Sequence, residues 1–412
     1  MSRRPVAAPG PRLAKMPRLG PDPRMAKALR KVGSTFALWR PAPQVLLNVE
    51  AVPTLFPGVN RVSRVGGWPI ARVAVAHGPS NEGKTAFALG LEGSFLARGH
   101  LVGHIDAENT TPMSWVEQLL REYAASPGFY ALRPQTYEEA RDAVLEFANG
   151  IVASRKAGDL DEATTGLVVV DSIRKLTPKA LMKELLKAIA DDAAEEEDGR
   201  RGRKKPKGMD GAGGRAGQIK AAINAVWLDE LVPLLARTRT AALIIARETE
   251  VEGDGFFATP QVKIGGGGAL KYDSSLVVRI TRDQFLYESK EKGAALVGER
   301  HAVEVHKTKV AGRDERWPTG YFSTSNGKLA PAGFDHARDV FELGTEVGAI
   351  ETASSWFSFE GKRLGNGVNA AIQALREDPG LAARVVEAVA EVDKANGPMP
   401  YVPSDAPLEA TG

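Results

Sequence analysis

The chain has 412 residues, 43% of them apolar and 25% charged, and a net charge of +3, which is ordinary for a soluble globular protein with room for more than one domain. No stretch approaches the roughly 20 apolar residues of a membrane helix, and the N-terminus lacks the apolar core of an export signal. The absence of cysteine excludes disulfides and thiol catalysis and favours the reducing cytoplasm, and the six scattered histidines do not predict a zinc site.

The first 40 residues are strongly basic, with ten Lys and Arg against one acid, Asp22. Residues 1–24 are rich in proline, so we expect a disordered arm that either contacts a polyanion or only aids solubility. Residues 25–45 begin with a short basic helical pattern and continue as a linker. A helix this short cannot bury its apolar side alone, and we expect it to mediate oligomerisation.

Residues 78–85 read GPSNEGKT. An apolar run precedes this stretch and a helical run follows it, which is the context of a phosphate-binding loop rather than of a chance glycine-rich turn. Its backbone N–H groups and the helix N-terminus would surround phosphate oxygens. Lys84 would reach the β- and γ-phosphates and Thr85 would hold Mg²⁺. The residues predicted to bind this ligand are Gly78, Pro79, Ser80, Asn81, Glu82, Gly83, Lys84, Thr85 and Ala86.

Continuous apolar strands alternate with helical patterns through residues 46–331, which we interpret as one α/β core. The expected strands are 71–76, 101–106, 166–172, 241–246, 276–281 and 302–306, and the expected helices are 85–98, 115–123, 137–155 and 217–235. This alternation is typical of a mostly parallel sheet covered by helices on both faces. Ligands of such sheets lie at the carboxyl ends of the strands.

Two acids follow strands in positions that suit catalysis. Asp171 ends a run of four apolar residues, the pattern of an acid that orients the Mg²⁺ shell. Glu108 lies two residues beyond its strand and is placed to polarise water as a general base. The alternative for Glu108 is an acid that only stabilises a helix N-terminus.

Two segments do not fit a compact interior. Residues 182–217 form a charged insertion, with acids first, then bases and then glycines. Residues 248–268 combine Phe256 and Phe257 with four successive glycines from Gly265. We expect both segments to be mobile loops.

After residue 331 the pattern changes. Residues 332–392 show three helical patterns, at 335–343, 368–376 and 381–392, around a hairpin pattern at 356–367. They predict a separate, small α+β domain. Residues 393–412 read as a disordered tail.

Several of these stretches, taken in order, resemble the bacterial RecA recombinase family. The matching stretches are residues 78–85, 104–108, 170–180, 266–272, 305–309 and 356–367. The resemblance covers roughly residues 25–392 and is interrupted by the charged insertion. An ordered set of this length is far more specific than a phosphate loop, which occurs in many unrelated enzymes. Phage-encoded recombinases of the UvsX type vary at the γ-phosphate sensor position, as this chain does at residues 247 and 248, which is consistent with a phage origin.

The resemblance implies an ATP-dependent DNA recombinase that polymerises on single-stranded DNA and exchanges strands with homologous double-stranded DNA. ATP and Mg²⁺ are the implied cofactors. By position, Lys84 and Thr85 hold phosphate and metal, Glu108 is the catalytic base and Asp171 supports the metal. The 332–392 domain is implied to bind DNA.

Four further residues take their roles from the resemblance. Trp115 falls where the family stacks an aromatic ring on adenine. Lys307 and Lys309 match lysines that reach the ATP of the adjacent protomer, where positive charge would stabilise γ-phosphate transfer. Tyr272 stands at an aromatic position that couples this interface to DNA.

The two irregular segments match the family's DNA-binding loops. Segment 248–268 offers charge, apolar bulk and close backbone approach to phosphates, or it is a crossing loop of no function. Its candidate contacts are Phe256, Phe257, Lys263, Gly265, Gly266, Gly267 and Gly268. The insertion carries a basic run that is either a second DNA contact or a solvated run paired with the preceding acids. Its candidates are Arg200, Arg201, Arg203, Lys204 and Lys205.

The largest departure from the family is the pair Arg247 and Glu248, where the family has Asn-Gln and the Gln senses the γ-phosphate. A carboxylate there would repel phosphate, so we favour Arg247 as a cationic sensor. Three functions therefore stand: a DNA-dependent ATPase that exchanges strands, a DNA-binding filament with impaired hydrolysis, and a ring helicase. The RecA-like C-terminal domain and the lysine pair argue against the ring.

Overall fold

The structure is a computed structural model that describes residues 49–184, 186–187, 215–251, 261–289, 291–310, 318–324 and 332–396. The predicted basic arm, the oligomerisation helix and linker, the middle of the charged insertion and most of the C-terminal tail lie outside the described residues. Those interpretations therefore stay predictions. Among the described helices, none is both long and apolar enough to cross a membrane.

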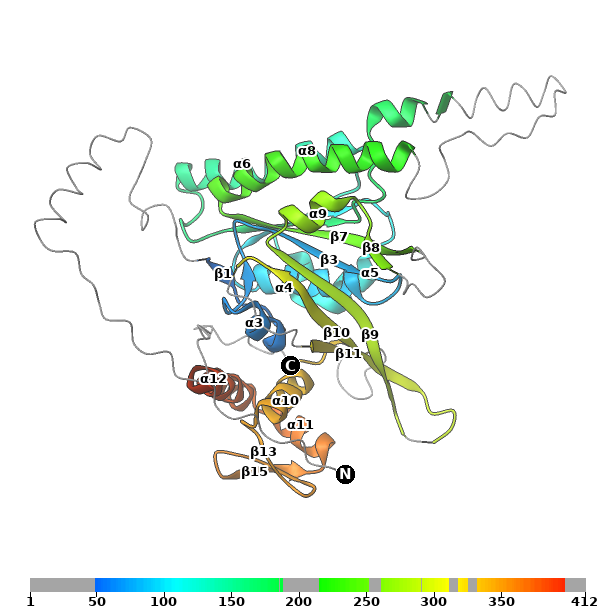
Figure 1. Cartoon of the computed structure of the whole chain (residues 1–412). Coiled ribbons are helices and arrows are strands. Elements are labelled where there is room, and N and C mark those ends of the chain that lie inside the picture. The colour runs from blue at the N-terminus through cyan, green and yellow to red at the C-terminus, as the bar shows by residue number, and fades with distance from the viewer. Residues whose placement is uncertain are drawn as a thin grey trace, which may run out of the picture. The chain divides into compact units, whose positions relative to one another are not determined.

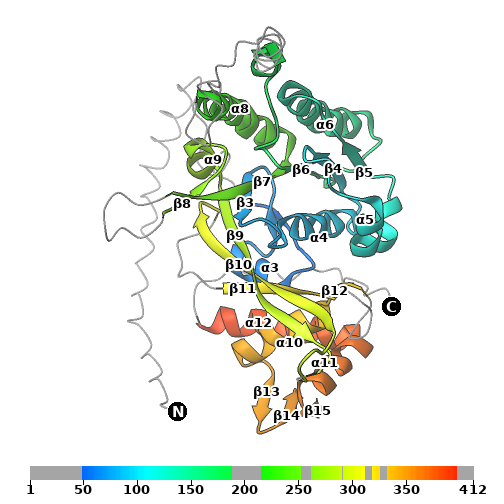
Figure 2. The same ribbon diagram turned by 90° about the vertical axis from the view of Figure 1, so that its right-hand side faces the viewer.

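The described residues form a central ten-stranded sheet (Figures 1 and 2) in the order β12-β11-β10-β9-β3-β7-β6-β4-β5, with β8 paired to β7. Six neighbouring strands from β9 to β5 run parallel: β3 (Val73–Gly78), β4 (Leu101–Asp106), β5 (Phe129–Leu132), β6 (Gly166–Asp171), β7 (Thr240–Val251) and β9 (Leu276–Tyr287). The others pair antiparallel: β8 (Gln261–Ile264), β10 (Leu296–Thr308), β11 (Pro318–Thr324) and β12 (Gly333–Phe334). The predicted α/β class with a mostly parallel sheet is confirmed.

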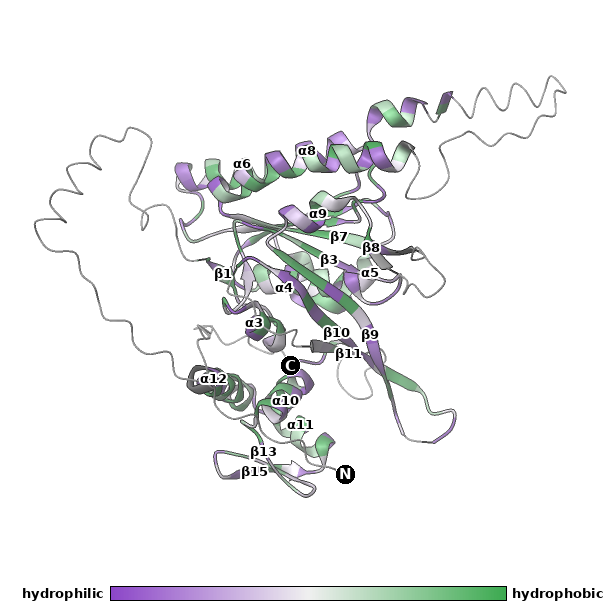
Figure 3. Cartoon of the chain, viewed as in Figure 1, coloured by the Kyte–Doolittle hydropathy of each residue, from purple (hydrophilic) through white to green (hydrophobic). Residues whose placement is uncertain are grey.

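Helices cover both faces of the parallel strands. Side chains alternate along a strand, so Ala74 and Ala76 of β3 join one buried cluster while Val73 and Val75 join the other. The first cluster includes α3 (Pro57–Ser63), α4 (Lys84–Leu96) and α5 (Met113–Leu120), followed by the short helix η1 (Arg121–Ala125). The second includes α6 (Tyr137–Ala157), α8 (Arg215–Thr238) and α9 (Gly268–Asp273). Figure 3 shows the hydrophobic strands β3 and β7 below helices of mixed hydropathy. Burial on two sides explains why these strands read as unbroken apolar runs.

The predicted loop over residues 248–268 is partly wrong. Strand β7 continues to Val251 and pairs antiparallel with β8, with Glu248 opposite Ile264. Gly268 begins α9. Residues 252–260, which include Phe256 and Phe257, lie outside the described residues. The polar residues that follow residue 246 concealed a hairpin, because they interrupt the apolar pattern that marks a strand.

Other elements differ from the sequence expectation in length or were missed. Strands β9 and β10 extend well beyond 276–281 and 302–306 and form a long antiparallel ribbon (Figure 1). Helix α8 begins inside the segment expected to be a loop, and residues 179–184 are helical. The sequence did not predict α3, β5, β1 (Ala51–Val52) or β2 (Trp68–Pro69). These elements are short or carry polar, half-exposed residues, so their periodicity is weak.

The C-terminal residues form the small α+β domain that the sequence predicts. Its three-stranded sheet contains β13 (Glu351–Ala353), β14 (Trp356–Phe359) and β15 (Lys362–Asn366). Its helices are α10 (His336–Val347), α11 (Val368–Glu377) and α12 (Pro379–Asn396). It has its own buried cluster, which includes Phe341, Phe357 and Leu375.

One buried ion pair ties α4 to the neighbouring sheet. The Nδ1 atom of His104 on β4 lies 2.7 Å from Oε1 of Glu92 on α4, and the side chains are 4% and 0% exposed. Burial alone would lower the pKa of His104, but the carboxylate of Glu92 outweighs it and raises that pKa to about 9. His104 is therefore held as a cation inside the fold.

We predict that this pair makes stability depend on pH. Because the pKa of His104 rises from 6.5 to about 9 on folding, its contribution is fully present below pH 6.5 and is lost as pH rises through about 9. The expected loss of unfolding free energy is about 3 kcal/mol. Urea unfolding on both sides of this window measures it. Glu92→Gln should flatten the dependence, and an equal slope in variant and wild type would contradict the assignment.

Candidate active site at the carboxyl edge of the sheet

The predicted phosphate loop connects β3 to α4, and two of its glycines have no room for a side chain. Gly83 has φ +90°, and a Cβ atom there would lie 2.3 Å from Nδ1 of His301 and 2.7 Å from the hydroxyl of Tyr321. A Cβ atom on Gly78 would lie 2.1 Å from the carbonyl oxygen of Ile280. The loop is thus packed directly against β9, β10 and β11, which only glycine permits.

The antiparallel strands hold the loop through hydrogen bonds that the sequence did not reveal. Tyr321 of β11 donates its hydroxyl to the carbonyl of Gly83 at 2.8 Å, and its ring stacks on that of His301 with centroids 4.8 Å apart. Nδ1 of His301 lies 3.1 Å from the carbonyl of Glu82, whose carboxylate accepts the backbone N–H of Arg282. No local motif marks these supports, because they come from strands at least 200 residues downstream.

Lys84 and Thr85 lie together with Asp171, as predicted. The Lys84 ammonium donates to the carbonyl of Pro79, and burial lowers the pKa of Lys84 while Asp171 acts in the opposite direction. The Thr85 hydroxyl donates to Oδ2 of Asp171 at 2.6 Å. Burial raises the pKa of Asp171, and the Thr85 hydrogen bond counteracts it. A bound polyanion would compensate the buried charge of Lys84, and a bound cation would compensate that of Asp171.

The oxygen atoms of Thr85 and Asp171 fit a magnesium ion. Mg²⁺ in nucleotide sites takes only one or two protein oxygens, and phosphate and water complete its octahedron. Among the described residues, no group of three or more His, Cys, Asp or Glu could hold a metal. A metal bound by protein side chains alone is therefore not supported within those residues, whereas a phosphate-bound Mg²⁺ is compatible with them.

Glu108 meets residues from two other strand ends. Its Oε1 accepts the Ser172 hydroxyl at 2.7 Å, and its Oε2 accepts Nη2 of Arg247 at 2.8 Å. The turn that carries Glu108 is held by Asp106, which accepts the backbone N–H groups of Thr110 and Thr111 at 3.3 Å. The predicted base therefore lies between β6 and β7, beside the predicted sensor.

Arg247 and Glu248 have separate surroundings, since successive residues of a strand face opposite sides. Arg247 faces Glu108, whereas Glu248 accepts from His77 at 2.8 Å and from Arg279 at 2.8 and 3.2 Å. Burial alone would raise the pKa of Glu248, but its bonds to Arg279 and His77 lower it. Burial also lowers the pKa of His77 to about 4, so Arg279 is the cation that balances Glu248. This arrangement supports Arg247, rather than Glu248, as the group that faces phosphate.

Comparison with known proteins adds sequence relatives to this geometry. Residues 338–392 match the family model of the RecA C-terminal domain. Protein RecA of Arthrobacter sp. (strain FB24) is 28% identical over 372 residues, covering 88% of this chain and 89% of that protein. Protein RecA of Bacteroides thetaiotaomicron is 27% identical over 340 residues, covering 81% and 85%. The chain is therefore similar to RecA proteins over most of its length, and its residues 338–392 match the RecA C-terminal domain.

A solved structure of the RadB recombinase is also similar. It is 16% identical, with 64% of this chain and 92% of that chain covered and a TM-score of 0.38. A score this low carries no argument. The assignment of this chain to an α/β fold rests on its own strand order.

Lys307 and Lys309 lie beside Tyr272, as their implied roles require. Their ammonium groups donate to the carbonyl of Tyr272 at 2.6 and 2.7 Å, at the C-terminal end of α9. The Tyr272 side chain is 69% exposed. The three residues therefore form one cluster at the C-terminal ends of α9 and β10, in which Tyr272 and Lys309 are exposed and Lys307 is half-buried.

The remaining site predictions are only partly described. Trp115 on α5 is half-buried against the first core cluster. Lys263 on β8 is exposed, and the N–H of Gly265 donates to the carbonyl of Arg247 at 2.8 Å. Gly266 and Gly267 have φ +103° and +99°. Candidates that lie outside the described residues are Arg200, Arg201, Arg203, Lys204, Lys205, Phe256 and Phe257.

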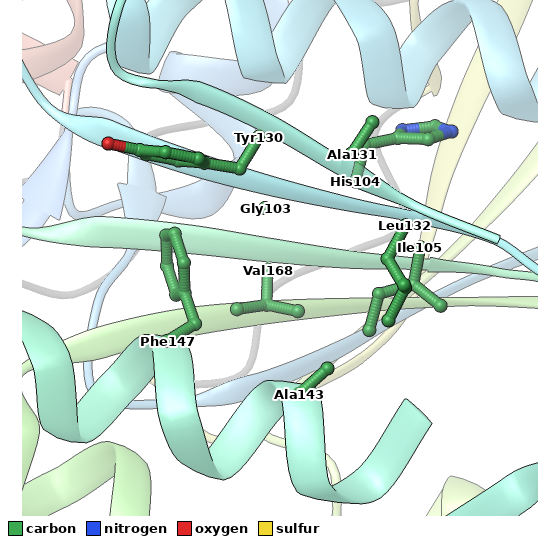
Figure 4. Close-up of a pocket in the computed structure, with 9 residues that line it drawn as sticks. All are labelled: Gly103, His104, Ile105, Tyr130, Ala131, Leu132, Ala143, Phe147 and Val168. Carbon is green, nitrogen blue, oxygen red and sulfur yellow. The ribbon is translucent and has the colours of Figure 1, made fainter. Parts of the chain in front are cut away.

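A shallow depression at the β5 edge of the sheet is separate from this site (Figure 4). Its lining is mainly apolar and includes Tyr130, Leu132 and Phe147. The ionisable histidine of this lining, His104, is already paired with Glu92, so the depression offers mainly packing surface.

We predict that Tyr321→Phe destabilises the fold, because the substitution keeps the stacked ring but leaves the Gly83 carbonyl without its donor. The expected loss is about 1 kcal/mol, measured by urea unfolding. Tyr287→Phe is the matched control, since Tyr287 is 55% exposed and should tolerate the change. Equal stability of the two variants would mean that the hydrogen bond does not support the loop.

Proposed function

We propose that this chain is an ATP-dependent DNA recombinase. In this proposal the protein binds Mg-ATP at the phosphate loop, forms helical filaments on single-stranded DNA in the cytoplasm, and pairs that strand with homologous double-stranded DNA. The observation that carries the proposal is the meeting of Lys84, Thr85, Glu108 and Asp171 at one edge of the sheet. The similarity to RecA proteins supports the DNA substrate.

Each residue of the edge has a role in ATP hydrolysis. Bound Mg²⁺ would neutralise charge on the phosphates. Thr85 and Asp171 would hold that ion, and Lys84 would leave the Pro79 carbonyl to meet the phosphates. Glu108 would accept a proton from the attacking water, since its carboxylate is the acid placed beyond the loop. Trp115 would contact adenine from the start of α5.

The cluster of Tyr272, Lys307 and Lys309 would complete the site of a neighbouring subunit. Two ammonium groups on one surface are costly to hold together unless an anion meets them. An ATP phosphate presented by a stacked protomer is such an anion. Turnover would then depend on assembly, which DNA promotes. The glycine-rich stretch 265–268 and Lys263 would contact the DNA strand.

A second candidate is a filament that binds ATP and DNA but hydrolyses ATP poorly. The ion pair between Glu108 and Arg247 favours it, because a base already paired with a guanidinium is a poor acceptor of a proton. A ring helicase receives less support, since residues 338–392 match the RecA C-terminal domain. Electron microscopy with single-stranded DNA and a slowly hydrolysed ATP analogue distinguishes filaments from rings.

We expect single-stranded DNA to stimulate ATP turnover and Lys84→Ala to reduce that turnover by at least about a hundredfold, the loss typical of one transition-state charge. Steady-state phosphate release measures it. Lys156→Ala, an exposed lysine in the last turn of α6, is the control. DNA binding without turnover in the wild type would favour the second candidate, and full turnover by Lys84→Ala would remove the phosphate-loop assignment.

Replacing both Lys307 and Lys309 by Ala should reduce DNA-stimulated turnover about a hundredfold while leaving ATP binding by the unassembled protein intact. The charges are lost only from the neighbour's site, so binding titrations and turnover should separate. Lys292→Ala, at another exposed lysine, should behave as wild type. Normal turnover in the double variant would reject catalysis across the interface.

A further inference from the structure

We propose that Arg247 is a switchable positioning residue: without nucleoside triphosphate it holds the general-base carboxylate of Glu108, and it exchanges that carboxylate for the terminal phosphate when the triphosphate binds. The inference rests on the proposed function, because it needs ATP at the phosphate loop. It goes further by assigning Arg247 a second partner and Glu248 a fixed, structural role.

The two residues at this point of β7 differ in how firmly they are held. Glu248 is 6% exposed and is bonded to side chains from β3 and β9, His77 and Arg279. Arg247 is 35% exposed, and its ion pair is with Glu108. Glu248 therefore anchors the strand, while the neighbouring guanidinium has solvent on one side and room to turn.

In this state Glu108 is not ready to act as a base. One carboxylate oxygen accepts the Ser172 hydroxyl and the other accepts the Arg247 guanidinium, at 2.7 and 2.8 Å. Both donors turn the carboxylate toward β6 and β7. A water molecule that attacks phosphate needs one of these oxygens, and Arg247 is the donor that can leave without breaking a buried bond.

The terminal phosphate offers Arg247 a stronger partner. Arg247 stands opposite Gly78, the first residue of the phosphate loop, where β7 pairs with β3, so Arg247 borders the region that phosphates would enter. A guanidinium binds phosphate oxygens through two parallel hydrogen bonds, and phosphate carries more charge than one carboxylate. A diphosphate would not reach this far, so the exchange distinguishes ATP from ADP.

The anchor at Glu248 keeps this movement local. The carbonyl of Arg247 accepts the N–H of Gly265 at 2.8 Å, and Asn224 of α8 donates to the carbonyl of Gly266 at 2.8 Å. The backbone at residue 247 also pairs with Gly78 of β3, so two neighbouring segments hold it and the side chain alone changes partner. Release of Glu108 then requires no rearrangement of the sheet.

Arginine modification with phenylglyoxal, followed residue by residue with mass spectrometry, tests the exchange in full-length protein. Glu108→Gln keeps the shape of the side chain but removes the charge, so Arg247 should react about fivefold faster than in wild type without nucleotide, the factor expected for a partly exposed ion pair. ATPγS should protect Arg247 again in this variant, and ADP should not. Arg141 is the internal control, because it has a similar exposure of 37% and a comparable ion pair with Glu230 at 2.7 Å.

Unchanged reactivity of Arg247 in Glu108→Gln, or equal protection by ATPγS and ADP, would overturn the exchange. Binding of both nucleotides to the wild type is measured first by calorimetry. If neither binds, the proposed function itself fails, which is a different result from binding without exchange. Arg247→Gln supplies an independent arm: it should weaken ATPγS binding about tenfold and leave ADP binding unchanged, and an equal effect on both nucleotides would also overturn the exchange.

Discussion

The register of the parallel strands is the constraint on which the site depends. β4, β6, β3 and β7 run in one direction, and their register sets Asp106 opposite Asp171 and Gly78 opposite Arg247. A slip of one residue would turn every side chain to the other face. Burial of these strands on both faces prevents that slip, so the core that stabilises the fold also aligns the residues predicted to bind nucleotide.

The same edge concentrates charge that water would otherwise solvate. Lys84, Asp171, Glu108 and Arg247 come within reach of one another, and each is at least partly buried. The fold tolerates this arrangement because the charges alternate in sign and share hydrogen bonds. The arrangement is also incomplete, since among the described residues the hydrogen-bond partner of Lys84 is a loop carbonyl and not a carboxylate. A partly buried cation that faces a backbone oxygen favours the binding of an anion.

The sequence was informative where chemistry and periodicity coincide. A local motif predicted the phosphate loop, and unbroken apolar runs predicted strands β4 and β6 and the acids that follow them. The structure places Lys84, Thr85 and Asp171 together. From the sequence, the choice between Arg247 and Glu248 as the phosphate-facing residue rested on charge repulsion alone. Successive residues of a strand face opposite sides, but which side faces the phosphate loop depends on how β7 pairs with its neighbours. The support from His301 and Tyr321 was invisible, since it joins residues with no shared pattern across more than 200 positions. The outer halves of β9 and β10 were missed because half-exposed strands carry polar residues.

The side chains of His301 and Tyr321 fill the space beside Gly83, so that even a methyl group on the glycine would overlap them. Gly83 is far in the sequence from His301 and Tyr321, yet no side chain at these positions can become larger unless another becomes smaller. They are therefore bound to change together as sequences diverge. A chimera that received only the phosphate-loop stretch of a relative would contain a loop whose shape matches the relative's packing residues and not His301 and Tyr321. A successful graft would have to include β10 and β11 as well.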